Sequence, residues 1–265
     1  MCKIHSISIL GGKTMTTKEK MNPNRTARIA GFLYGPLQIA LAPFGIMYVP
    51  TVLVVAGDAV TTTENIMANM GLFRLSIATA LIVQVTHLVI VLLLYKLLKP
   101  VNKDIASLMV IFMLVGIPIT MLNELNHAAI VLLLSGAGYL KVFTADQLQA
   151  LVLMFHGLHE YVINSIASIF WGLWLFPMGY LVIKSGFISK IPGVLLIIAG
   201  SAYLIDTFAK ILLPNYGETI FATIITLAMF GEIVFPFWLL IKGVDVEQWE
   251  KRALEPAFIS PMPKG

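Results

Sequence analysis

Two apolar stretches of the chain each hold ionisable side chains at spacings that would gather them on one face of a helix. In the later stretch, His156, His159, Glu160 and Asn164 stand at i, i+3, i+4 and i+8, which is a single helical face. The earlier stretch holds a similar group, whose members are Asn123, Glu124, Asn126 and His127. Ionisable residues inside apolar helices are costly and mark candidate functional sites. If these faces meet, imidazoles and carboxylates would share one pocket.

Three kinds of chemistry could use such a pocket. Glu124, His127, His156 and His159 offer nitrogen and oxygen ligands at helical spacing, which suits zinc or another divalent metal. A histidine–carboxylate pair could also perform acid–base chemistry without a metal. Alternatively, a series of such groups could relay protons or ions, as in transporters. The competing structural interpretation is that these side chains only hold helices together, at about 0.6 kcal/mol per hydrogen bond.

Other polar residues are expected near the same depth of the molecule. Asp206 and Lys210, at i and i+4, should form an ion pair, and Arg74 should reach the lipid headgroups or an acidic neighbour. The full set of candidate pocket residues is Arg74, Asn123, Glu124, His127, His156, His159, Glu160, Asn164 and Asp206. Four further polar residues are expected deeper or towards the cytoplasmic side, namely Gln38, Gln84, His87 and Glu232.

The composition indicates which kind of element must position these residues. Of the 265 residues, 58% are hydrophobic and only 12% are charged, whereas about a quarter of the residues in soluble domains are charged. A water-exposed surface cannot be made from so few polar residues, so the composition predicts an all-α, polytopic membrane helix bundle. Six stretches are long and apolar enough to cross a bilayer, at about 29–56, 71–96, 105–136, 147–183, 190–212 and 218–241.

Prolines are expected to distort several of these helices. Pro36 and Pro43, with Gly35 and Gly45 beside them, should bend the first span. Three further prolines should act similarly in the third, fourth and sixth spans, namely Pro118, Pro177 and Pro236.

The distribution of basic residues predicts the orientation of the bundle. Of the 18 Lys and Arg residues, all but Arg74, Lys141 and Lys210 fall in the two tails or in the second and fourth connections. Because cytoplasmic segments are enriched in Lys and Arg, both termini should be cytoplasmic. The formal charge of +4 therefore marks a membrane face, and no basic stripe with interleaved aromatic residues indicates nucleic-acid binding.

The chain divides into three parts. Residues 1–21 are expected to be a disordered leader that could precede the true start, 22–243 a six-helix transmembrane domain, and 244–265 a polar cytoplasmic tail. Cys2 is the only cysteine, which excludes a disulfide framework and a cysteine-based metal site. No phosphate-binding loop, dinucleotide fingerprint or nucleophile elbow is present, so no organic cofactor is expected.

Several phrases of the sequence, in this order, identify a resemblance. They are NPNRTARIAGFLY, LFRLSIATALI, LLYKLLKPVNK, LNELNHAAIVLLLSGAGYL, LQALVLMFHGLHE, IFWGLWLFPMGYLVIKSGFISKIPG, GSAYLID and LLPNY. Over about residues 22–243 the chain resembles a bacterial family of multi-pass membrane proteins known as domain of unknown function 4386. The resemblance implies a protein of the bacterial cytoplasmic membrane with the lipid bilayer as its partner, and it supplies no catalytic residues.

Three functions are therefore compatible with the sequence. The first is hydrolysis or acid–base chemistry on a membrane-dissolved substrate at an outward-facing site, with Glu124 or Glu160 as the base. The second is a small ion-coupled transporter, in which Gln38, His87 and Glu232 would connect the site to the inner face. The third is a non-catalytic membrane scaffold or partner protein. Substrate and oligomeric state are not predicted.

Overall fold

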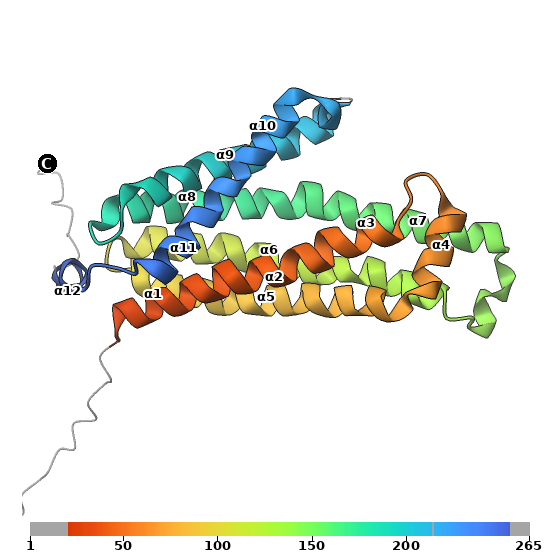
Figure 1. Cartoon of the computed structure of the whole chain (residues 1–265), viewed down its shortest axis with the longest axis horizontal. Coiled ribbons are helices and arrows are strands. Elements are labelled where there is room, and N and C mark those ends of the chain that lie inside the picture. Colours follow the sequence, from red (N-terminus) through yellow and green to blue (C-terminus); the bar gives the residue numbers. More distant parts are fainter. Residues whose placement is uncertain (1–20, 214, 255–265) are drawn as a thin grey trace, which may run out of the picture.

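The computed structural model describes residues 21–213 and 215–254, and in this part of the chain every regular element is a helix. Figure 1 shows an elongated bundle in which long helices run up and down its length. The elements are α1 (Pro23–Phe32), η1 (Leu33–Leu37), α2 (Gln38–Pro43), η2 (Phe44–Tyr48), α3 (Val49–Leu53), α4 (Ala59–Ala68), α5 (Met70–Leu98), α6 (Lys103–Leu133), η3 (Gly138–Val142), α7 (Ala145–Tyr161), η4 (Val162–Ala167), α8 (Ser168–Ser185), α9 (Lys190–Leu212), η5 (Tyr216–Glu218), α10 (Ile220–Met229), η6 (Phe230–Ile233), α11 (Val234–Ile241) and α12 (Val246–Leu254).

Five helices in the described part of the chain are long and apolar enough to cross a membrane. They are Met70–Leu98, Lys103–Leu133, Ala145–Ser185, Lys190–Leu212 and Ile220–Ile241. Their bounds lie within three residues of five of the six predicted spans. The described part of the chain is thus an all-helical bundle of the membrane type.

The remaining predicted span, 29–56, corresponds to a mixed helical run that is not among these five helices. Residues 23–53 stay helical throughout but alternate between α and π segments. Pro36 lies inside η1, and η2 begins directly after Pro43. Proline removes a backbone donor and disturbs the i→i−4 ladder, which accounts for the two π segments. The predicted distortion of the first span is therefore present as two π-helical segments.

The other prolines behave differently from one another. Pro118 and Pro177 lie inside α6 and α8 without a change of helix type. Pro236 follows the 3₁₀ segment η6 in the last span. In the fourth span the irregular segment is η4, a π-helix without proline, at which the hydroxyl of Ser168 donates to the carbonyl of Ile163 (2.7 Å).

Helix α6 shows how side chains divide between the interior and the surface. Leu122 and Leu125 are 65% and 64% exposed, whereas Asn123 and Glu124 between them are 4% and 7% exposed. A soluble protein would hide the leucines and expose the amide and the carboxylate. The reversed arrangement fits a helix whose outer face contacts lipid and whose polar residues face the bundle interior.

Small residues allow α8 and α9 to approach closely. A Cβ atom added to Gly179 would lie 2.7 Å from the carbonyl oxygen of Gly193, and one added to Gly172 would lie 3.0 Å from that of Gly200. The two glycine pairs are seven residues apart on each antiparallel helix, so they repeat along one seam. Close backbone contact of this kind is how small residues join helices in membranes.

The two ends of the bundle differ in charge. The start of α1, the α5–α6 and α8–α9 turns and α12 lie at the same end, on the left in Figure 1. The basic residues of these segments therefore gather there; they are Arg25, Arg28, Lys96, Lys99, Lys103, Lys184, Lys190, Lys242, Lys251 and Arg252. The opposite end holds α4, η3 and the α9–α10 connection.

The polar segment after Gly243 contains an additional helix, α12, that the sequence did not indicate. Its Trp249 is only 8% exposed, and the indole N–H donates to the backbone carbonyl of Leu97 at the end of α5 (2.9 Å). The start of the segment is held by the side-chain oxygen of Asn24, which accepts from the N–H of Val244 (3.4 Å). The predicted leader, apart from residue 21, and the end of the tail from 255 lie outside the described residues.

Candidate functional site

Helix α6 presents three polar residues to the bundle interior at one depth. Asn123, Glu124 and His127 are 4%, 7% and 3% exposed. His127 follows Glu124 by three residues and Asn123 by four, a spacing that places the three side chains on one side of the helix, opposite the exposed leucines. All three therefore face the neighbouring helix α7, which packs against α6.

Helix α7 supplies the second half of the site near its end. A capping box at Thr144 and Gln147 sets the start of the helix, which then places His156 and His159 on its buried face. Directly after Glu160 and Tyr161 the chain passes into the π segment η4. There the side chain of Asn164 donates to both the backbone oxygen (2.9 Å) and Oε2 (3.1 Å) of Glu160. Such π segments inside α-helices are frequent at functional sites.

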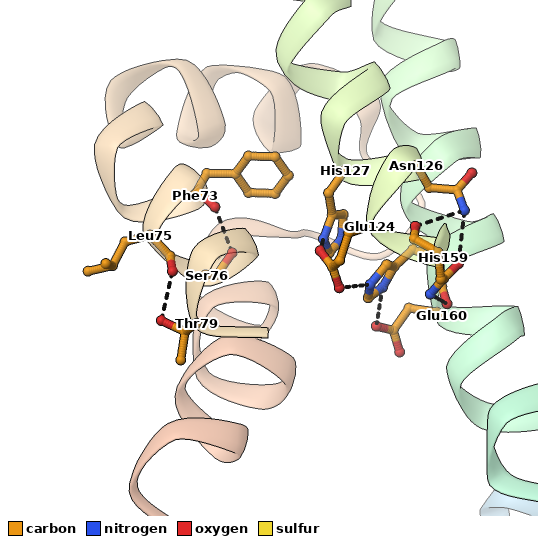
Figure 2. A network of polar contacts seen from close by, with 10 residues as sticks. Phe73, Leu75, Ser76, Thr79, Glu124, Asn126, His127, His159 and Glu160 are labelled. Atoms are coloured by element: carbon orange, nitrogen blue, oxygen red, sulfur yellow. Dashed lines mark hydrogen bonds and ion pairs between the residues drawn. The ribbon is translucent and has the colours of Figure 1, made fainter. Parts of the chain in front are cut away.

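The carboxylate of Glu124 joins the two helices through a pair of imidazoles. Its Oε2 lies 3.2 Å from Nδ1 of His127, and its Oε1 lies 3.1 Å from Nε2 of His159. The two rings stack with centroids 3.6 Å apart and an interplanar angle of 21°. Figure 2 shows the three side chains converging, with Glu160 on the far side of His159.

A second set of contacts fixes His159 in place. Its Nδ1 lies 3.7 Å from Oε1 of Glu160, so the imidazole stands between two carboxylates. The amide of Asn123 donates to the backbone carbonyl of His159 (3.1 Å), and Asn126 in turn donates to Oδ1 of Asn123 (2.9 Å). These bonds tie the polar faces of α6 and α7 together and confirm that the two faces meet.

Aromatic contacts complete the surroundings of His127. The ring of Phe73 on α5 meets it edge-on, with centroids 5.1 Å apart, and the ring of His156 lies parallel to it at 6.0 Å. The sequence did not indicate Phe73 as part of the site, because an apolar residue in an apolar helix carries no local signal.

The structure brings together most, but not all, of the predicted site residues. Those in or beside the network are Asn123, Glu124, His127, His156, His159, Glu160 and Asn164. Arg74 is exposed on α5, next to Phe73. Asp206 is buried on α9 and forms the expected ion pair with Lys210, with Nζ and Oδ2 2.7 Å apart.

The donor set fits a divalent metal. Glu124, His127 and His159 each offer a ligand atom, and these atoms lie within 4.8 Å of one another. In a tetrahedral zinc site with metal–ligand distances of 2.0–2.1 Å, the ligand atoms would be about 3.3 Å apart. Two imidazoles and one carboxylate form a set that catalytic zinc and non-haem iron both use.

Several buried polar atoms around this set have no hydrogen-bond partner among the described residues. They are Nε2 of His127, Nδ1 of His156, Nδ1 of His159 and Oε1 of Glu160. Buried polar atoms are normally satisfied, so unsatisfied ones at a ligand-like site indicate that a further group belongs there.

The deeper polar residues lie outside this network. The carboxylate of Glu232 accepts hydrogen bonds from the hydroxyls of Tyr34 (3.2 Å) and Tyr203 (2.8 Å). Gln38 donates to the backbone carbonyl of Val83 (3.3 Å). These residues line a separate cavity together with His87.

Comparisons with known proteins identify a family and add no activity. A family described as "Domain of unknown function (DUF4386)" matches residues 29–243. An uncharacterized protein of Archaeoglobus fulgidus is 32% identical over 169 residues, which cover 63% of this chain and 83% of that protein. Proteins similar to this chain are therefore not confined to bacteria. No solved structure matches the chain.

Proposed function

The chain belongs to the family described as domain of unknown function (DUF4386), and we propose that it is a metal-dependent hydrolase acting within the membrane. Glu124, His127 and His159 would hold zinc or a similar divalent ion. The observation that carries this proposal is the convergence of three buried ligand atoms within 4.8 Å, beside buried imidazole nitrogens that have no partner.

Each neighbouring residue has a role that follows from its contacts. A bound zinc ion supplies a Lewis acid that activates water near neutral pH. Glu160, beside His159 and oriented by Asn164, would serve as the general base for the attacking water. Asn123 positions His159 through its backbone carbonyl. Outer partners of this kind orient ligands and tune the metal.

The exposure of the site residues supports a substrate that is dissolved in the membrane. The side chain of Glu160 is 38% exposed, whereas those of Glu124 and His159 are 9% and 2% exposed. Its neighbour Tyr161 is 56% exposed on the apolar surface of the bundle. A substrate would therefore approach laterally, at Glu160.

We propose six spans, with both termini in the cytoplasm of a prokaryotic cell. The mixed α and π run of residues 23–53 would be the additional span, since it extends along the other long helices. The gathering of basic residues at one end of the bundle supports the cytoplasmic assignment of that end. The metal site would then face the outer half of the cytoplasmic membrane.

The first test is the metal content of the purified protein. We expect about one zinc or iron ion per chain in mild detergent, measured by elemental mass spectrometry, and loss of that ion in Glu124→Gln and His159→Gln. His87→Gln, which alters a histidine outside the site, is the control and should keep the metal. A wild-type protein that retains no metal after incubation with zinc would refute the proposal.

Hydrolysis requires a separate assay. Wild-type protein in mixed micelles should cleave a membrane-soluble fluorogenic ester, and a chelator or Glu160→Gln should abolish cleavage. If the metal is present but ester, amide and phosphodiester probes all remain intact, the protein binds a metal and the hydrolytic part of the proposal is wrong.

A small ion-coupled transporter is a second candidate, favoured by the cavity that contains the polar residues Gln38, His87 and Glu232. It predicts a pH-dependent solute flux in proteoliposomes that is lost in Glu232→Gln and unaffected by Glu124→Gln. A non-catalytic scaffold predicts neither metal, nor cleavage, nor flux.

A further inference from the structure

The bundle contains a cavity of about 230 Å³ with an aromatic wall. Tyr34 and Trp174 form one side, with ring centroids 5.5 Å apart, and Trp171 and Tyr203 form another, with centroids 6.5 Å apart. The cavity is distinct from the metal site. Met113 lines it and stands eleven residues before Glu124 on α6, about 16 Å along the helix.

A carboxylate without a cationic partner lies in this cavity. Tyr203 and Tyr34 both donate their hydroxyls to Glu232, one to each carboxylate oxygen (2.8 and 3.2 Å). None of the ion pairs among the described residues includes Glu232. A carboxylate in an apolar wall is stabilised by an opposite charge, and here the protein provides only neutral donors.

Two further polar atoms of the cavity wall are unsatisfied. Oε1 of Gln84 and Nδ1 of His87 are buried without a hydrogen-bond partner among the described residues, and Gln84 as a whole is only 5% exposed. The oxygen of an amide can only accept a hydrogen bond, so the missing partner of Gln84 is a donor. A ligand that satisfies the cavity must therefore bring N–H or O–H groups.

We propose that this cavity binds a small organic ammonium ion, a protonated amine that carries an apolar group. Its N–H groups would donate to Glu232 and Gln84, and its positive charge would lie against the faces of the indole and phenol rings. An anion is disfavoured by the carboxylate. A purely apolar ligand would leave Glu232 without a countercharge and Gln84 without a donor.

The experiment compares three probes of one shape and different charge. The full-length protein in detergent is titrated with benzylammonium, benzyl alcohol and benzoate, and binding is followed by calorimetry and by the shift in unfolding temperature. We expect benzylammonium to bind at least about tenfold more tightly than benzyl alcohol, and benzoate not to bind. Equal affinity for the ammonium and the alcohol, or no saturable binding of benzylammonium, would overturn the proposal.

Variants then identify the site of binding. Glu232→Gln should lower the affinity for benzylammonium about tenfold or more and leave benzyl alcohol unchanged. Glu64→Gln, which removes an exposed carboxylate on α4, is the matched control and should bind like the wild type. If Glu232→Gln does not fold, Trp171→Leu, at a partly exposed position, removes an aromatic face and should weaken the ammonium selectively. Unchanged ammonium affinity in a folded Glu232→Gln protein would show that the ligand binds elsewhere.

Discussion

The imidazole rings of His127 on α6 and His159 on α7 stack with their centroids 3.6 Å apart. Both rings also bind the same carboxylate, that of Glu124, through contacts of 3.2 and 3.1 Å. The two histidines are 32 positions apart in the chain, yet each places a ring nitrogen against one oxygen of the Glu124 carboxylate. This arrangement requires α6 and α7 to pack together. This relationship makes the contribution of each histidine separately testable.

His156 should be dispensable for metal binding, although the sequence alone makes it as good a ligand as His159. Its ring is 6.0 Å from that of His127, and it is not one of the three residues whose ligand atoms lie within 4.8 Å of one another. We expect His156→Gln to retain zinc, while His159→Gln loses more than the 10–100-fold in affinity that removal of an outer partner costs. Zinc titration against a competing chromogenic chelator measures both. Equal losses in the two variants would make His156 a ligand.

The seam between α8 and α9 should not tolerate a methyl group. In Gly179→Ala the new Cβ would lie 2.7 Å from the backbone oxygen of Gly193, so the helices must separate. We expect a loss of about 1–3 kcal/mol in the free energy of unfolding, measured by denaturation in micelles. Gly157→Ala on α7 is the control, because nothing lies within 4 Å of its added Cβ. That variant should be neutral or stabilised by up to about 1 kcal/mol. Equal stability of the two variants would refute close packing at this seam.

The start of α4 should lose stability at low pH. Asp58 caps this helix by accepting from the N–H (2.9 Å) and the hydroxyl (2.7 Å) of Thr61, and these hydrogen bonds lower the pKa of its carboxyl group. Because the folded-state pKa is lowered, the stabilisation is present above the unfolded-state pKa and is lost as the pH falls through the folded-state pKa. Hydrogen exchange of the α4 amides should therefore be faster in Asp58→Ala than in the wild type at pH 7. At a pH below the folded-state pKa of Asp58, the α4 amides of the two proteins should exchange at the same rate. A difference that persists at this pH would show that the Asp58 carboxylate is not the cap that stabilises α4.

The two ends of the bundle should differ in access from outside the cell. On a Cys2→Ser background, a cysteine at Asp146, exposed in the first turn of α7, should react with a membrane-impermeant maleimide in intact cells. A cysteine at Glu247, exposed on α12, should react only after permeabilisation. The opposite pattern would invert the proposed orientation and place the proposed metal site in the cytoplasmic half.

The helices and most residues of the candidate site could be predicted from the amino-acid sequence. Span bounds follow from the length of apolar runs, which is a local property, so those of five spans agree with the structure within three residues. The expectation that Glu124 and His159 lie on inward helical faces follows from spacing and from the cost of exposing charge to lipid. The ion pair of Asp206 and Lys210 was predictable because both residues lie on one helix.

Which helices and side chains contact one another depends instead on tertiary packing. The order of residues does not specify that α6 faces α7 at the depth of Glu124, that Phe73 rather than Arg74 contacts the cluster, or that Tyr34 and Tyr203 bind Glu232. Nor does it indicate that Trp249 docks the tail against Leu97. Such contacts depend on the rotation and depth of each helix relative to its neighbours. These are set by close packing along whole interfaces, such as the glycine seam of α8 and α9, and not by any local pattern.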